Sequence, residues 1–183
     1  MKLYLFIIFT IISVSLLGNW TWASSIGGDS MERVWDIESD SASNFYLIGD
    51  FTDSLYVNGQ SYAGYGVSDS FVMKFSSSGA FLWAQTFGSV AEDSAISVGT
   101  DPLGNCYVSG YFVDTLRVQN QSVVSHGGWD IYIVKLDPQG NLLWLRSYGG
   151  PLNDIAYGLA VSSMGRVYAA GWFADSISYP DGS

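Results

Sequence analysis

The chain repeats itself at a shift of 61 positions, and this repeat constrains the fold more than any other feature. The shift aligns the same residue types in three successive units without a gap. The aligned sets are Trp22, Trp83 and Trp144; Gly27, Gly88 and Gly149; Tyr46, Tyr107 and Tyr168; Gly49, Gly110 and Gly171; Phe51, Phe112 and Phe173; and Asp53, Asp114 and Asp175. A period of this size is typical of solenoids, propellers and repeat arrays.

Each unit is predicted to form four antiparallel strands joined as two hairpins. The strands expected in the middle unit cover residues 95–100, 106–112, 131–136 and 142–148. The turns at 101–105 and 137–141 each contain a Pro, which fixes φ, and a Gly, which is free to take a positive φ. Short extended pieces at 116–118 and 122–124 fill the connection between the two hairpins.

A four-stranded unit repeated without helices predicts an all-β fold, a β-propeller built from 61-residue four-stranded blades. One such sheet cannot bury both faces alone, so neighbouring sheets must stack, with the repeated aromatic residues between them. The units cover residues 22–82, 83–143 and 144–183, and residues 20–26 are expected to form the fourth strand of a blade. We therefore expect an incomplete propeller of about two and a half blades, completed either by the remaining blades of a longer chain or by other copies.

Residues 1–18 are predicted to be a signal peptide. Lys2 is followed by an apolar run from Leu3 to Leu17, which is typical of a secretory leader. The alternative is a membrane anchor, although a spanning helix requires roughly twenty residues. Export would place the repeat region, residues 19–183, outside the cell or on its surface, with no membrane insertion after the leader is removed.

The composition excludes some partners and favours a packed core. The chain has 7 Lys and Arg against 17 Asp and Glu, a net charge of −10, which repels nucleic acid phosphates and anionic lipids. Hydrophobic residues make up 48% of the chain, so a core can form. Cys106 is the single cysteine, which excludes an intrachain disulfide framework, and it is predicted to be a core residue.

The carboxylates Glu32, Asp93 and Asp154 recur once per unit, in the loop that follows the repeated glycine. Around a propeller axis they would be candidate Ca²⁺ or sugar ligands. The alternative is a turn or capping carboxylate that accepts backbone N–H groups. A catalytic pair is not expected, because acid–base work needs carboxylates in two different environments and a repeated residue meets the same one each time. No other metal or cofactor is expected.

The triplets beginning at Asp53, Asp114 and Asp175 place a hydroxyl residue after each Asp, namely Ser54, Thr115 and Ser176. An Asx-type turn opening a short strand explains this spacing. The triplet also resembles the Asp-Ser/Thr-apolar acceptor that some Gram-negative bacteria use for O-glycosylation of exported proteins. These three hydroxyls are therefore candidate modification sites.

The histidine and two of the lysines complete the set of candidate residues. His126 is the only histidine and has no second histidine with which to build a metal site. Lys74 and Lys135 lie at equivalent positions near the end of an apolar strand, and we expect them to extend along it and reach solvent at the blade edge.

The strings from Asp130 to Gly150 and from Ala156 to Phe173 resemble SBBP-type β-propeller repeats. The shared pattern is D-x-[FY]-[VI]-x-K-[LF], a turn, L-x-W, G-G and then G-x-V-Y-x-x-G, and with variations it covers nearly everything after residue 19. The resemblance implies a propeller, and repeats of this kind usually occur in large exported bacterial proteins without an assigned activity.

We therefore predict a non-enzymatic, exported propeller module that serves as an interaction or structural scaffold for an unknown protein or carbohydrate. The alternative is the propeller part of a secreted carbohydrate-binding or carbohydrate-active protein. An acidic or aromatic residue confined to one unit and facing the axis would favour that alternative, and none stands out in the sequence. A third interpretation is a half-ring that assembles with itself.

Overall fold

The computed structural model describes residues 8–9, 24–28 and 30–177. These residues form strands and turns only, and none of them belongs to a helix long and apolar enough to cross a membrane. Two short strands, β1 (Ile8–Phe9) and β2 (Ser24–Ser25), pair with each other. Apart from these two pairs of residues and Ile26, the leader predicted at 1–18 and the strand predicted at 20–26 lie outside the described residues.

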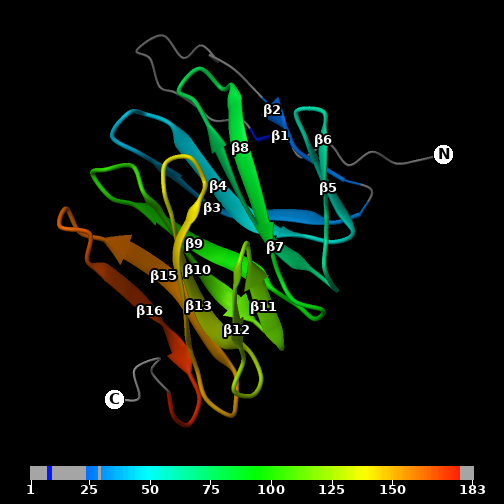
Figure 1. Ribbon diagram of the computed structural model, residues 1–183, viewed down its shortest axis with the longest axis vertical. Coiled ribbons are helices and arrows are strands. Elements are labelled where there is room, and N and C mark those ends of the chain that lie inside the picture. The colour runs from blue at the N-terminus through cyan, green and yellow to red at the C-terminus, as the bar shows by residue number, and fades with distance from the viewer. Residues whose placement is uncertain (1–7, 10–23, 29, 178–183) are drawn as a thin grey trace.

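Two sheets of four antiparallel strands and a third of two strands follow in chain order (Figure 1). The first sheet consists of β3 (Glu32–Ser39), β4 (Phe45–Phe51), β7 (Asp69–Phe75) and β8 (Phe81–Phe87); the second of β9 (Ser94–Thr100), β10 (Cys106–Phe112), β13 (Asp130–Leu136) and β14 (Leu142–Tyr148); the third of β15 (Asp154–Val161) and β16 (Val167–Phe173). The four strands expected in the middle unit are confirmed to within a residue. Trp83 and Trp144, at which the second and third predicted units begin, lie inside fourth strands.

A small separate hairpin joins the second and third strands of each complete sheet. These hairpins are β5 (Ser54–Val57) with β6 (Gln60–Ala63), and β11 (Thr115–Val118) with β12 (Gln121–Val124). They correspond to the short extended pieces expected in this connection. The strands start one residue earlier than expected, and both hairpins have the same register.

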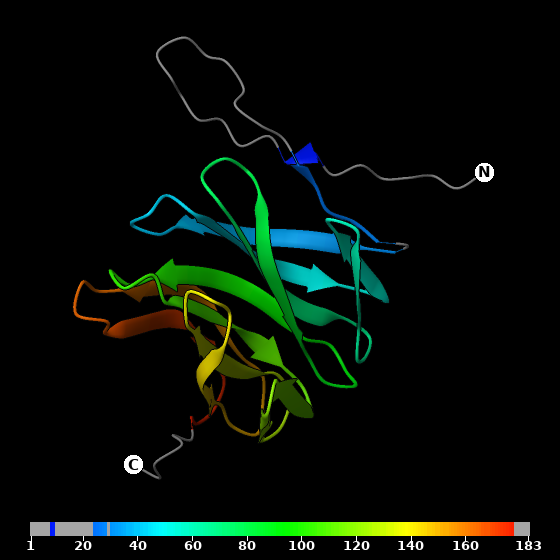
Figure 2. The same cartoon turned by 45° about the horizontal axis from the view of Figure 1, so that its top comes forward.

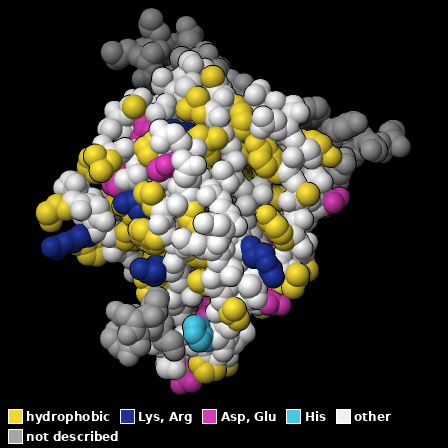
Figure 3. All heavy atoms as spheres, viewed as in Figure 1, with side chains coloured by type: hydrophobic (Ala, Val, Ile, Leu, Met, Phe, Trp, Pro, Cys, Tyr) yellow, Lys and Arg dark blue, Asp and Glu magenta, His cyan; other side chains and the backbone are white. Residues whose placement is uncertain are grey.

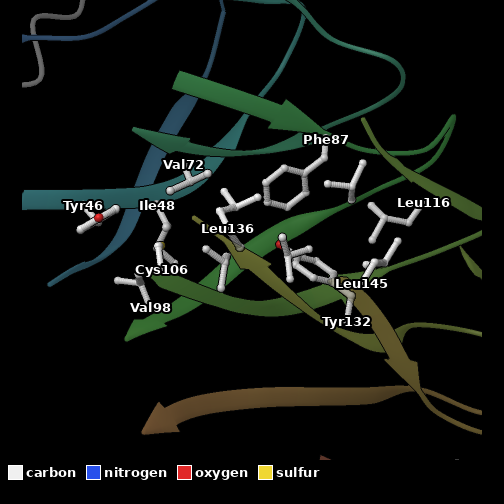
Figure 4. Packing of buried hydrophobic residues seen from close by; sticks show 14 of the residues in the cluster. Tyr46, Ile48, Val72, Phe87, Val98, Cys106, Leu116, Tyr132, Leu136 and Leu145 are labelled. Carbon is white, nitrogen blue, oxygen red and sulfur yellow. The ribbon is translucent and has the colours of Figure 1, made fainter. Parts of the chain in front are cut away.

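The sheets stack on one another through their first strands. Strand β9 packs against β3 and β4 of the preceding sheet, and β15 packs against β9 and β10 (Figures 1 and 2). The space between the first two sheets is filled by apolar side chains from both, among them Ile48 and Val72 from one side and Cys106 and Leu136 from the other (Figure 4). Each large side chain buried in this way stabilises the fold by roughly 1.5–3 kcal/mol. The stacking explains why an isolated unit would not suffice.

Every first strand carries a β-bulge at the same position of the repeat. The bulged residues are Trp35 in β3, Ile96 in β9 and Tyr157 in β15. A bulge inserts one residue into a strand and turns its side chain away from the regular alternation. The residue type at this position therefore changes between units without any change in pairing.

The bulge also explains one of the repeated glycines. A Cβ atom on Gly49, Gly110 or Gly171 would lie within 1.9 Å of a carbonyl oxygen on the facing first strand. These oxygens belong to Arg33, Ser94 and Ile155, which occupy the same position in the three units. Backbone packs directly on backbone here, so only glycine fits.

Candidate functional site

At one end of the sheets, a buried lysine joins the first hairpin to the third strand. The Asp40 carboxylate accepts the Asn44 N–H at 2.9 Å, and its other oxygen lies 3.3 Å from Lys74 Nζ. The same ammonium lies 4.7 Å from the centre of the Tyr46 ring. Burial by itself raises the pKa of Asp40, but the hydrogen bonds from Asn44 and the charge of Lys74 outweigh it and leave that pKa below its ordinary value.

This cluster also crosses to the next sheet. Lys74 Nζ and Trp83 Nε1 both donate to the Pro138 carbonyl, at 3.3 and 3.0 Å, and the Tyr46 hydroxyl donates to the Gly104 carbonyl at 2.8 Å. The repeated Trp and Tyr thus pack between sheets, as expected. The prediction that Lys74 reaches solvent is wrong, because it is 4% exposed and its charge is needed inside the joint.

The candidate Ca²⁺ ligands Glu32, Asp93 and Asp154 lie at the opposite end, each where a first strand begins. The Asp154 oxygens accept the N–H groups of Gly150 at 2.8 Å and Ala174 at 3.0 Å, and Asp93 accepts the Ser89 N–H. These are the contacts of a capping carboxylate. In the described part of the chain, no three His, Cys, Asp or Glu side chains gather where they could hold a metal ion.

A second repeated carboxylate lies at this end. It opens the repeated D-x-[FY]-[VI]-x-K-[LF] pattern, but it was not among the candidate site residues. Asp69 and Asp130 are the first residues of β7 and β13 and are fully buried. Asp69 accepts the N–H groups of Tyr65 and Gly66, while Asp130 contacts His126 Nδ1 at 2.9 Å. They align under the same 61-position shift, and this recurrence is the signal that makes them candidates.

The buried carboxylates affect one another. Burial raises the pKa of Asp93 to about 7, and the nearby charge of Asp69 acts in the same direction. Burial also raises the pKa of Asp69. Neither carboxylate is open to a substrate, because both are fully buried. The pair therefore belongs to the junction between sheets.

Two of the three candidate modification sites lie at the starts of the small hairpins. Ser54 opens β5, Thr115 opens β11, and Ser176 is exposed. The Asp before each of them has a left-handed backbone, with φ of 67°, 68° and 70°. Asp tolerates this conformation better than most residues. The repeated Asp is thus explained by a backbone requirement.

Cys106 lies fully buried in the core between the first two sheets, which confirms the prediction for this residue. Burial raises the pKa of its thiol. A buried thiol is not reactive as a nucleophile.

The first sheet contains a charged cluster with no counterpart in the other units. The Asp50 carboxylate is 1% exposed and binds Arg33 through Nε at 2.9 Å and Nη2 at 2.7 Å. Its other oxygen accepts Trp35 Nε1 and, from the second sheet, the Ser94 hydroxyl at 2.7 Å. The hydrogen bond to Asp50 raises the pKa of Arg33. The buried charge is therefore neutralised and fully hydrogen-bonded.

The outer parts of this cluster face solvent. Trp35 is 50% exposed, and the Arg33 guanidinium lies 5.6 Å from the centre of its ring. Nearby, the rings of Tyr111 and Trp129 pack at 4.9 Å. Burial raises the pKa of Tyr111, with a further contribution from the charge of Asp50. Arg33, Trp35, Tyr111 and Trp129 together form an arrangement of aromatic rings and a cation, which we call the Trp35 surface.

The residue types in this cluster differ between the units, and the expectation that no acidic or aromatic residue confined to one unit faces the axis stays a prediction. Asp50 stands where the other units have Tyr111 and Trp172, and Trp35 where they have Ile96 and Tyr157. The sequence contains both differences. What it does not show is that Arg33, Trp35 and Asp50 meet, since they belong to two strands.

Comparison with known proteins finds a distant relative. No family model matches the chain. An uncharacterised WD repeat-containing protein of Acanthamoeba polyphaga mimivirus is 24% identical over 166 residues, covering 80% of this chain. The chain spans only 12% of that relative. Together with the stacked antiparallel sheets, this similarity fits a repeat protein of the β-propeller type and points to a scaffold-type fold.

Proposed function

We propose that the chain is a non-enzymatic β-propeller repeat module that serves as an interaction scaffold. Its sheets are the blades of an SBBP-type propeller, and further units of the same kind complete the ring. The support is the stacking of sheets through their first strands, the repeat in the sequence and the similarity to a WD repeat-containing protein. Propellers of this kind present their strand ends and loops to partners.

The Trp35 surface is the observation that carries this proposal. Asp50 has no free oxygen for a substrate, since Arg33, Trp35 and Ser94 occupy both. Its role is to hold the indole and the guanidinium in place. Trp, Tyr and Arg are the residues most often found at energetic hot spots of protein interfaces, and rigid side chains lose little entropy on binding. The cluster is therefore suited to contact rather than to chemistry.

The surface in Figure 3 agrees with a contact function. Hydrophobic side chains reach the surface in several places, and the charged side chains stand apart from one another rather than in one field (Figure 3). Such a surface offers separate contact points. This face does not show the continuous charge that nucleic acid binding requires.

The test is a partner capture that compares two exposed substitutions. Wild-type protein, Trp35→Ala and Leu103→Ala are used as baits, and captured proteins are quantified by mass spectrometry. Leu103 is 80% exposed in the turn that joins β9 to β10 in the second sheet, and it serves as the control. We expect at least one partner to be kept by Leu103→Ala and lost by Trp35→Ala. Identical partner sets for both variants would refute the proposal.

Export is part of the same proposal, and its support is the apolar run from Leu3 to Leu17 behind Lys2. Expression of the full chain with a C-terminal tag, followed by fractionation of cells and medium, tests it. We expect the tag outside the cytoplasm and the residues of the leader missing from the purified protein. A tag that stays in the cytoplasm on an uncleaved chain would contradict export.

A further inference from the structure

Strand β16 exposes side chains that are buried at the same positions of the other sheets. Tyr168 is 58% exposed and Phe173 is 56% exposed. Their counterparts in β10, Tyr107 and Phe112, are 1% and 0% exposed. Among the described residues β16 pairs only with β15, so one of its edges is free.

In both complete sheets the corresponding edge is covered by the third strand in one fixed register. Tyr46 stands opposite Lys74 and Tyr107 opposite Lys135. At the far end of the same pairs, Phe51 and Phe112 each face the Asp that opens the third strand. The two complete sheets therefore show the same pairing of second and third strands, which is the pairing expected for a strand that covers β16.

The lysine in this interface depends on a carboxylate in the first hairpin. Lys135 Nζ lies 3.5 Å from Asp101 Oδ2 and 4.7 Å from the centre of the Tyr107 ring. In the same turn, Asp101 Oδ1 accepts the Asn105 N–H at 3.0 Å. The lysine charge is thus neutralised within the joint.

The third unit has the same turn with different charges. Ser162 replaces the Asp and accepts the Arg166 N–H at 3.0 Å, so the turn is unchanged. Arg166 stands where the other units have Asn44 and Asn105. Arg166 is exposed in the described structure. A lysine opposite Tyr168 would therefore find no carboxylate in this turn and would add a second cation to it, which is costly if a covering strand buries the joint.

We propose that β16 is a docking edge for the third strand of a further like repeat, and that this strand carries an acidic residue, not lysine, opposite Tyr168. The strand opens with an Asp opposite Phe173 and pairs antiparallel to β16, as β13 pairs with β10. Arg166 supplies the cation of the joint and the incoming strand supplies the carboxylate. This inference rests on the proposed propeller and adds the chemistry of the strand that the third sheet selects.

A second copy of this chain is not the occupant. Strands β7 and β13, which have the required pattern, are each paired on both sides. A copy would have to dock through its own β16, which has Tyr and Phe in place of the charged residues. Self-association through β16 is therefore an outcome that would overturn the proposal.

The experiment adds the strand to the full chain as a peptide. Two fluorescent peptides cover residues 126–149, which contain the β13–β14 hairpin: the native sequence and the same sequence with Lys135→Glu. Binding is measured by fluorescence anisotropy, and hydrogen exchange of β16 amides locates it. We expect the Glu peptide to bind at least about tenfold more tightly than the Lys peptide, since one close charge pair is worth that much or more.

The matched receptor carries Ser162→Asp and Arg166→Asn, which restores the turn residues of the second unit. We expect it to reverse the preference, with the Lys peptide binding more tightly. Equal binding of both peptides, no protection of β16, or dimerisation through β16 would each overturn the inference. The readout is separate from partner capture at the Trp35 surface, so a failure here and a failure of the proposed function can be told apart.

Discussion

Replacing Asp93 by Asn is expected to remove a loss of stability that the protein suffers as the pH rises. Asp93 is fully buried, and burial raises its pKa to about 7, with the charge of Asp69 adding to the effect. In the unfolded chain the same carboxyl group has a pKa near 3.8. Between these values the folded state holds a proton that the unfolded state has released.

The sign and size follow from this difference. Because the folded state binds the proton more tightly, the contribution to stability is fully present below about pH 4 and is lost as the pH rises through 7. Each pH unit in this window costs about 1.4 kcal/mol, so the total is about 4 kcal/mol. Asn carries no charge, and its side-chain oxygen can still accept the Ser89 N–H.

Urea unfolding of wild type and Asp93→Asn at a series of pH values from 4 to 8 measures the effect. The two proteins should have similar free energies of unfolding at pH 4, and the variant should be more stable at pH 8. Asp137→Asn is the control with an effect of opposite sign. Burial by itself raises the pKa of Asp137, but the hydrogen bonds from Asn141 and Gln139 outweigh burial, so the pKa lies below its ordinary value. Removing that carboxylate should destabilise the protein at neutral pH and have less effect in acid. Parallel pH profiles for wild type and Asp93→Asn would refute the argument.

Two further substitutions test the joints between sheets. Gly88→Ala should destabilise the protein by at least about 1–3 kcal/mol, because a Cβ there would lie 1.8 Å from the Asp69 carboxylate. Gly27→Ala is the control and should cost little, because its Cβ would meet nothing within 4 Å. Urea unfolding midpoints of the two variants test the difference. Lys74→Met should lower the free energy of unfolding by about 3–5 kcal/mol, because it leaves the buried Asp40 carboxylate without its cation. Thermal unfolding measures the effect, and equal melting temperatures for wild type and variant would contradict it.

The repeat made the strands and the stacking predictable. Alignment of the units identified Trp83 and Tyr46 as packing residues, and both bridge two sheets. The alignment compares equivalent positions of the units, however, and it is silent on contacts between different positions. The ion pair of Lys74 with Asp40 and the bonds of Asp50 with Arg33 connect different strands or turns. Nothing in the local pattern of either partner indicates them.

The repeated carboxylates also show what the alignment of the units does not reveal. Asp93 and Asp154 stand out in the sequence because they recur, but recurrence does not distinguish a ligand from a cap. The donors that surround them, the N–H groups of Ser89 and Gly150, belong to the backbone and leave no trace in the sequence. Conversely, Asp50 does not recur, so a comparison of the units for what they share passes over it.

The bulge in the first strand creates one position whose side chain can vary while the strand pairing stays the same. Trp35, Ile96 and Tyr157 differ widely in size and polarity, yet the register on either side of them is the same in all three sheets. The neighbouring strand accommodates the bulge with a glycine in every unit, so the bulged position itself is released from the demands of the core. Each unit thus has one position at which different side chains can be substituted without changing the strand pairing of the rest of the sheet. If the units serve as the proposed interaction scaffold, the contact surface can be changed one unit at a time through this position.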